Sequence, residues 1–265
     1  MSMRGILLVT FGSSYPQTQR AYDLIESETK KYLKDNSKEC EVRWAYSSKI
    51  LREKINKTTR RRIDSPEEAL KKFIDEKFDE ITVQSLHVIA GHEFNALRDM
   101  ILKNSKYFNE LSLGLPLISS ISDIDLVNKY LLASLKEERR RDDAVIFFAH
   151  GTDHYGGLAY TAIQNQLSKL DECAFVATVE GEDKENYFNI LRDCKRRGVR
   201  RAYLVPYMSV VGDHIINDMA GEDDESLKSI LERENIESIP ILRGLAEDKD
   251  IVGVWMKHLM DAKKI

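Results

Sequence analysis

Residues 6–14 read ILLVTFGSS, a short and almost continuously apolar run that ends in a Gly-Ser-Ser turn. A run of this kind is typical of a strand that is covered on both faces of a parallel sheet. Residues 144–152 repeat the pattern as AVIFFAHGT. A helical periodicity follows each run, over 17–33 and 158–170. Because strands then alternate with helices, the sequence predicts an α/β fold built on parallel sheets flanked by helices.

The alternation continues along the rest of the chain. Ser65-Pro66-Glu67-Glu68 predicts a helix start, because Ser65 can cap the helix, Pro66 suits its first turn and Glu68 completes a capping box. Gly91-His92-Glu93 opens another helix. Further strands are expected over 41–47, 80–88, 173–179 and 201–210, and further helices over 184–197, from Asp224 and from about Asp248.

The two halves of the chain resemble each other in sequence. The glycines Gly12 and Gly151 align the two apolar runs and the turns that follow them. An alignment of VQSLHVIAGHEF, which starts at residue 83, with VPYMSVVGDHII, which starts at residue 205, needs no gap and brings His92 onto His214. The sequence therefore predicts a duplicated lobe rather than two unrelated domains.

The length supports the same organisation. A chain of 265 residues corresponds to roughly two domains of about 150 residues each. We expect an N-terminal α/β lobe over 1–120 and a C-terminal α/β lobe over 121–265. The boundary falls in residues 113–125, which are rich in Gly, Pro and Ser.

Composition excludes several classes of protein. The chain has 40 basic and 44 acidic residues, which argues against a general nucleic-acid binder but leaves room for a local site for a small anion. Three widely spaced cysteines indicate neither a disulfide framework nor a zinc ribbon. Because no apolar run approaches ~18 residues and residues 6–10 are too few for a signal-peptide core, we expect no membrane association and a cytoplasmic location.

Three candidate ligands follow three different strands of the second lobe. His150, Glu180 and His214 each lie at the end of a strand or in the turn just after it. Because the carboxyl ends of parallel strands share one edge, two imidazoles and a carboxylate are expected to converge there. Such a set suits Co²⁺, Ni²⁺, Fe²⁺ or Zn²⁺ better than Mg²⁺ or Ca²⁺. The spacing alone leaves ordinary loop histidines as an open alternative.

Other strand ends offer weaker signals. Ser13 and Ser14 precede a helix and could form an anion cradle or a capped helix start, and the stretch lacks the GxGxxG pattern of a dinucleotide site. His87 and His92 could face a cleft from the first lobe. His154 could contact a substrate or face solvent.

Five segments together resemble the anaerobic cobaltochelatases of the CbiK type, which are class II tetrapyrrole chelatases. The resemblance covers nearly the whole chain in the same order, and the VGDHxxNDM stretch with the paired HGT and VEG turns is specific. The segments are LLVTFGSSYPQT from Leu7, VQSLHVIAGHEF from Val83, FFAHGT from Phe147, TVEG from Thr178 and VGDHIINDMAGEDDESLKS from Val211.

The resemblance implies two similar α/β lobes with the active cleft between them. It also implies insertion of Co²⁺ into sirohydrochlorin, or into precorrin-2, without ATP and in anaerobic cobalamin synthesis. The metal-binding residues of the family fall on His150, Glu180 and His214, the same three residues that the strand ends single out. Co²⁺ is then a substrate, and no organic cofactor is expected.

The expected chemistry assigns a role to each residue. Neutral His150 and His214 would replace water on the metal, while Glu180 would balance its charge. His150 would be the principal base that removes pyrrole protons, because imidazole side chains exchange protons near neutral pH. We expect the substrate cleft to be lined, in addition, by Ser13, Ser14, His87, His92 and His154.

Two alternatives remain open from the sequence. The same ligand set could serve iron insertion for sirohaem or nickel insertion into a nickel tetrapyrrole, because affinity order and metal supply both affect which metal binds. The chain could instead be a carrier that holds a metal or a tetrapyrrole without converting it. A homo-oligomer is also compatible with the sequence.

Overall fold

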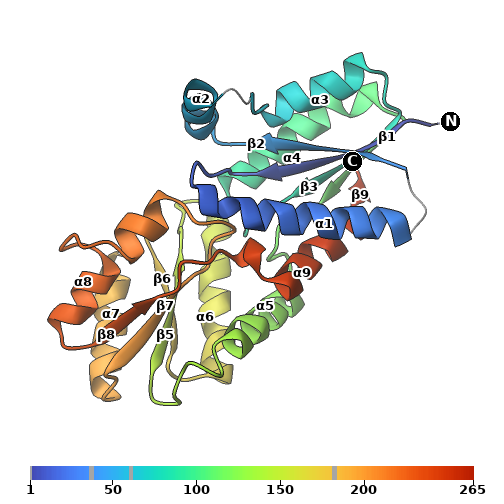
Figure 1. Ribbon diagram of the computed structural model, residues 1–265. Coiled ribbons are helices and arrows are strands. Elements are labelled where there is room, and N and C mark those ends of the chain that lie inside the picture. The colour runs from blue at the N-terminus through green and yellow to red at the C-terminus, as the bar shows by residue number, and fades with distance from the viewer. Residues whose placement is uncertain (1, 36–38, 60–61, 181–183) are drawn as a thin grey trace. The chain divides into compact units, whose positions relative to one another are not determined.

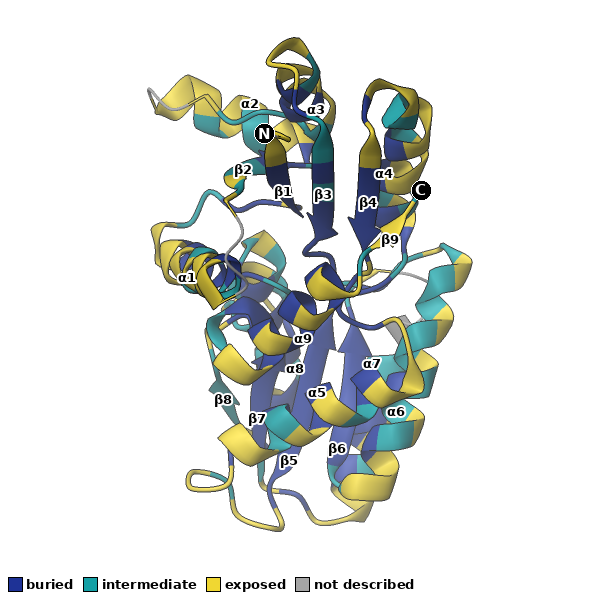
Figure 2. Ribbon diagram, turned by 90° about the vertical axis from the view of Figure 1, so that its right-hand side faces the viewer, coloured by how far each residue is buried: buried dark blue, intermediate teal, exposed yellow. Residues whose placement is uncertain are grey.

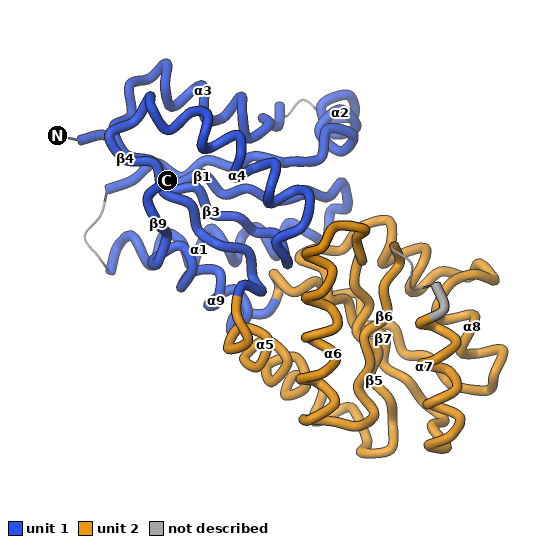
Figure 3. The backbone as a smooth tube through the Cα atoms, turned by 180° about the vertical axis from the view of Figure 1, so that it is seen from behind, with its two compact units in different colours: residues 1–119, 248–265 blue, residues 120–247 orange. Residues whose placement is uncertain are grey.

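The computed structural model describes residues 2–35, 39–59, 62–180 and 184–265. The chain divides into two compact units, residues 1–119 with 248–265 and residues 120–247 (Figure 3). Each unit is a largely parallel sheet flanked by helices, which confirms the predicted α/β fold (Figure 1). In the described part of the chain, no helix is both long enough and apolar enough to cross a membrane.

The first unit contains a sheet of strand order β2-β1-β3-β4-β9. Strand β1 lies between β2 and β3, and its residues 5–10 are buried because helices cover both faces of the sheet (Figure 2). The short last strand runs antiparallel to β4, whereas the other pairs are parallel. The strands are β1 Arg4–Thr10, β2 Glu41–Tyr46, β3 Glu80–Ser85, β4 Glu110–Gly114 and β9 Lys263–Lys264.

Helix α3 of the first unit begins where the sequence supplies a cap. Ser65 accepts from the Glu68 amide and Glu68 accepts from the Ser65 amide, which confirms the predicted capping box. Helices α3 and α4 cover one face of the sheet, where Phe73 and Phe94 join its core. The helices are η1 Pro16–Thr18, α1 Gln19–Asp35, α2 Lys49–Thr58, α3 Pro66–Asp75, α4 His92–Asn104, η2 Ser105–Tyr107 and α9 Lys249–Met260.

The second unit contains a parallel sheet of strand order β6-β5-β7-β8. Every residue of β5 is buried, as its AVIFFA sequence predicts. The strands are β5 Ala144–Ala149, β6 Ala174–Thr178, β7 Arg201–Pro206 and β8 Glu237–Pro240. The helices are α5 Ile121–Ser134, η3 Tyr155–Gly157, α6 Leu158–Leu170, α7 Lys184–Arg196, the π-helix η4 His214–Met219, α8 Leu227–Arg233 and η5 Leu245–Glu247.

The two units repeat one topology, as the sequence similarity predicts. In both, the first strand along the chain lies between the second and the third, and the fourth lies beside the third. The turn after the first strand contains a glycine in the left-handed region in each unit, Gly12 at φ 103° and Gly151 at φ 79°. A residue without a Cβ is needed at both positions because other residues rarely adopt this conformation.

The strand register corrects one detail of the internal alignment. With Gly12 placed on Gly151, Leu8 corresponds to Phe147, and these residues pair with Gln84 and Val205. Val205 therefore corresponds to Gln84 and not to residue 83. The gapless alignment of residues 83–94 with residues 205–216 is thus wrong by one residue along the strands. The extra residue lies in the following turn of the second unit, because His92 and His214 each begin a helix.

The structure also places the C-terminal segment differently from the expected lobes. The first unit runs to residue 119 and also contains residues 248–265, which we expected in the C-terminal lobe. Trp255 of α9 is fully buried, and its indole N–H donates to the His87 carbonyl at 3.3 Å. Apolar side chains of α9 thus complete the core of the first unit.

Strands β3 and β7 end earlier than their apolar patterns predict. The Leu86 amide still donates to Val9, but the His87 carbonyl already accepts from the Leu117 amide, outside the ladder between β1 and β3. The chain has therefore left the sheet before the apolar run ends. Helix α8 likewise begins at Leu227 rather than near residue 224, because Ser226 caps it.

Candidate metal site

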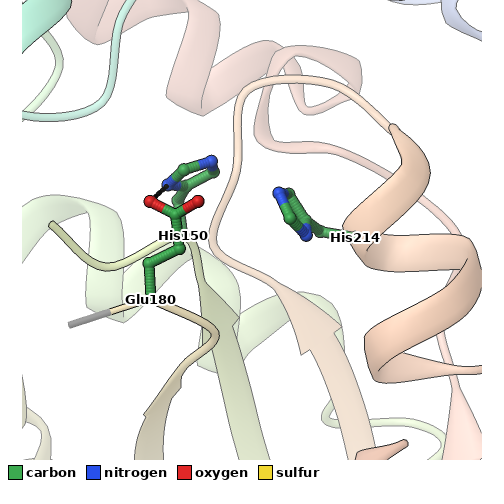
Figure 4. Close-up of side chains that lie close together, drawn as sticks. All are labelled: His150, Glu180 and His214. Carbon is green, nitrogen blue, oxygen red and sulfur yellow. Dashed lines mark ion pairs between the residues drawn. The ribbon is translucent and has the colours of Figure 1, made fainter. Parts of the chain in front are cut away.

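Three turns at one edge of the second sheet carry the expected ligands. His150 directly follows β5, Glu180 follows β6, and His214 is the first residue of η4, after β7. Because β5 lies between β6 and β7, the ends of these strands are neighbours. Figure 4 shows the three side chains converging from these segments. Gly181, the last residue of the TVEG motif, lies outside the described residues.

A close backbone contact fixes the first two turns against each other. The Glu180 amide donates to the His150 carbonyl at 2.8 Å, and the Val179 amide donates to the Ala149 carbonyl at 3.1 Å. Gly151 lies so close that a Cβ on it would be 2.0 Å from the Glu180 carbonyl oxygen. Glycine is thus required at 151 both by its backbone conformation and by this contact, which sets the position of Glu180 relative to His150.

The three side chains form a group that could hold a metal ion. Each offers one ligand atom, and these atoms lie within 4.8 Å of one another. The Nδ1 atom of His150 is 3.5 Å from a carboxylate oxygen of Glu180, and the His150 and His214 ring centroids are 4.9 Å apart with planes at 88°. Ligands about 2.1 Å from one metal ion are about 3–4 Å apart, so small side-chain shifts suffice to close the site.

Both imidazole side chains are partly exposed. The side chains of His150 and His214 are 42% and 39% exposed. The Nδ1 atom of His150 faces the Gly151 carbonyl at 3.2 Å, which is an acceptor, so a proton on Nδ1 leaves the Nε2 lone pair for a ligand. Two imidazole nitrogens and a carboxylate are a ligand set that suits a borderline divalent ion such as Co²⁺ or Zn²⁺.

Sequence reasoning missed one residue beside this group. The Nδ1 atom of His214 is 2.6 Å from a carboxylate oxygen of Asp218, which lies four residues further along η4. The signal was present as the spacing His-x-x-x-Asp in the VGDHIINDM stretch. It is a weak signal, because a histidine and an aspartate four residues apart are common on exposed helices.

The remaining expected residue of the second unit has a local role. The His154 Nδ1 atom accepts from the Gly156 amide at 2.9 Å and so caps the short helix η3. Its ring contacts that of Tyr155, with centroids 4.0 Å apart. The structure therefore does not include His154 in the group of His150, Glu180 and His214.

In the first unit the serines follow β1. Ser13 is buried, and its hydroxyl accepts from the Tyr15 amide at 3.2 Å. Ser14 is partly exposed. This hydrogen bond builds the turn that leads into η1, but Tyr15 is the N-cap of that helix and no side chain caps it, so neither serine forms the expected capped helix start.

Buried His87 lies between two hydroxyl groups in an arrangement that the sequence did not predict. Its Nδ1 is 2.9 Å from the Ser85 hydroxyl and its Nε2 is 3.3 Å from the Ser47 hydroxyl. Burial lowers the pKa of His87 to about 4, although the charge of Glu93 opposes the shift. His87 is therefore neutral at neutral pH. His92, by contrast, is exposed at the start of α4.

The sequence matches a known family and two named relatives. The family model described as cobalt chelatase (CbiK) matches residues 4–264. A sirohydrochlorin cobaltochelatase, CbiKC, from Nitratidesulfovibrio vulgaris is 34% identical over 264 residues, which cover 99% of this chain and 91% of the relative. A sirohydrochlorin cobaltochelatase from Salmonella typhimurium is 30% identical over 266 residues, covering 98% of this chain and 96% of the relative.

Solved structures share the fold at lower identity. SirB from Bacillus subtilis, in a structure with Fe³⁺, superposes with a TM-score of 0.64 at 16% identity and covers 98% of this chain and 95% of its own. CbiX, described as the terminal enzyme of sirohaem synthesis in denitrifying bacteria, gives 0.56 at 13% identity, with 97% and 99% covered. With a family match over almost its full length, this chain belongs to the CbiK cobalt chelatase family and is a metal chelatase.

Proposed function

We propose that this chelatase inserts Co²⁺ into sirohydrochlorin, without ATP, as a step of cobalamin synthesis. The observation that carries the proposal is the group of His150, Glu180 and His214, whose ligand atoms lie within 4.8 Å of one another at the carboxyl edge of the second sheet. The names of the two relatives, both sirohydrochlorin cobaltochelatases, support the choice of metal and tetrapyrrole. Precorrin-2 is the alternative substrate.

Insertion requires that the metal lose water and that the tetrapyrrole lose two pyrrole protons. In the proposal, His150 and His214 replace water on Co²⁺ through neutral imidazole nitrogens, which bind the ion but still release it. Glu180 balances the charge of the ion. His150 is the principal base, because a proton taken up by this side chain also weakens its hold on the metal and so favours transfer.

The acidic substituents of the substrate need hydrogen-bond donors. Ser13, Ser14, His87, His92 and His154 remain our candidates for this contact. The neutral state of His87 supports a role as a hydrogen-bonding group rather than as a positive charge. The position of Ser47 beside His87 adds its hydroxyl to the set.

Variants of the proposed ligands test the metal site. We expect His150→Ala, His214→Ala and Glu180→Gln to fold and to lose insertion at limiting Co²⁺, followed anaerobically by the absorbance of sirohydrochlorin. Glu172→Gln is the matched control, because Glu172 precedes strand β6, whereas Glu180 follows it, and its side chain is 82% exposed. Undiminished insertion by all three ligand variants would contradict the assignment.

Two further arms of the assay define the reaction. Sub-stoichiometric protein should convert an excess of sirohydrochlorin, whereas a carrier would stop at one equivalent. Competition among Co²⁺, Fe²⁺ and Ni²⁺ should favour Co²⁺ at equal free concentrations. A preference for Fe²⁺ or Ni²⁺ would contradict the proposed metal while leaving the ligands in place.

A further inference from the structure

Asp218 holds a position that the insertion chemistry described above does not use. One of its carboxylate oxygens lies 2.6 Å from Nδ1 of His214. In the described part of the chain, no lysine or arginine forms an ion pair with Asp218, so this carboxylate is not part of an ordinary surface ion pair. The Asp218 side chain is 46% exposed, and its short contact is with His214.

We propose that Asp218 is a positioning residue that fixes the orientation and the tautomer of His214, so that Nε2 is presented to the metal. This inference rests on the proposed role of His214 as a ligand. An ionised carboxylate can only accept a hydrogen bond, so Nδ1 of His214 must carry the proton at this contact. The lone pair is then on Nε2, and the ring cannot turn without breaking a charge-assisted hydrogen bond.

The helix that carries both residues supports this role. His214 and Asp218 are the first and fifth residues of the π-helix η4, a type of helix that is often found at functional sites. Ile215 and Met219, one position further along in each case, are fully buried in the core of the second unit. The packing of Ile215 and Met219 in the core therefore fixes the helix segment that carries His214 and Asp218. The side chains of His214 and Asp218 are in contact in this fixed segment.

The negative charge of Asp218 also affects the ligand itself. A histidine that donates its second ring N–H to a carboxylate is a more basic metal ligand than one that faces water. Loss of such a partner usually lowers metal affinity about 10-fold to 100-fold. The metal must later be released, so Asp218 affects how tightly His214 holds the ion before transfer.

Co²⁺ titration of the full chain, monitored by absorbance, measures the contribution. We expect Asp218→Asn to raise the Kd for Co²⁺ about 10-fold and Asp218→Ala to raise it further, because Asn keeps an acceptor oxygen but loses the charge. Asp224→Asn is the matched control: it removes the same charge from an 89% exposed side chain six residues away. An unchanged Kd in Asp218→Ala would overturn the inference.

A second readout reports the tautomer directly. In ¹⁵N-edited NMR spectra of the metal-free protein, His214 should carry its proton on Nδ1, and Asp218→Ala should shift the population toward Nε2. A purely structural role of Asp218 would leave the tautomer unchanged. Retention of the Nδ1 proton in Asp218→Ala would contradict the inference.

A double-variant comparison separates the two proposals. If His214→Ala leaves Co²⁺ binding unchanged, the ligand assignment fails. If His214→Ala weakens binding but Asp218→Ala does not, only the positioning role fails. We expect Asp218→Ala to weaken Co²⁺ binding in the wild-type background and to have little further effect in His214→Ala, because the carboxylate acts through the imidazole.

Discussion

The contact between Gly151 and the Glu180 backbone yields a prediction with a built-in control. Gly151→Ala places a Cβ 2.0 Å from the Glu180 carbonyl oxygen, where real Cβ atoms essentially never come closer than 3.0 Å. The Glu180 backbone must then move by about 1 Å, and a displacement of that size can cost about 100-fold in function. The variant also adopts a left-handed conformation, which costs about 1–2 kcal/mol for a residue with a Cβ.

Gly198→Ala separates the two effects. Gly198 has φ 70°, but a Cβ on it meets nothing within 4 Å. We therefore expect Gly198→Ala to lose about 1–2 kcal/mol in urea unfolding and to bind Co²⁺ normally. Gly151→Ala should lose more stability and should also weaken Co²⁺ binding strongly, measured by the same titration. Equal stability losses together with normal Co²⁺ affinity in Gly151→Ala would refute the reasoning.

Three further predictions concern groups with defined surroundings. His87 has a pKa of about 4 in the folded protein and 6.5 in the unfolded chain, so between pH 4 and pH 6.5 it takes up a proton only on unfolding. The free energy of unfolding should therefore fall by about 3 kcal/mol from pH 7 to pH 4. His87→Gln should reduce that loss, measured by urea titrations at both pH values. Burial raises the pKa of Asp171, but hydrogen bonds from Arg139 and a backbone amide lower it by more. Asp171→Asn should lower the free energy of unfolding by about 2 kcal/mol at pH 7. The difference from the wild-type protein should disappear as the pH falls through the lowered pKa. Ser65→Ala removes one half of a capping box and should lower the unfolding free energy by about 1 kcal/mol, and an unchanged value would show that water replaces the cap.

The group of His150, Glu180 and His214 could be predicted because each residue follows a strand that the sequence marks. Residues 144–149 are apolar throughout and mark the end of β5, so His150 is placed by the sequence alone. Glu180 and His214 follow strands that are nearly as clear. Convergence then follows from the rule that parallel strands share their carboxyl edge.

Features that depend on tertiary packing escaped the sequence. The pairing of Asp218 with His214 depends on the helix type and on which side of η4 is buried, and neither is visible in a six-residue stretch. The hydroxyl groups of Ser47 and Ser85 surround His87 only because two strands flank β1 in a particular order. The one-residue difference between the units lies in a turn, where apolar periodicity gives no register.

The return of α9 to the first unit bears on the order of events during synthesis. Residues 120–247 form a continuous segment, whereas the first unit lacks buried Trp255 and the rest of α9 until residues 248–265 have been made. N-terminal units usually fold first as the chain emerges from the ribosome. Here we expect the opposite order of completion, so that a premature stop before residue 249 would leave the earliest-made unit unfinished and the later-made one intact.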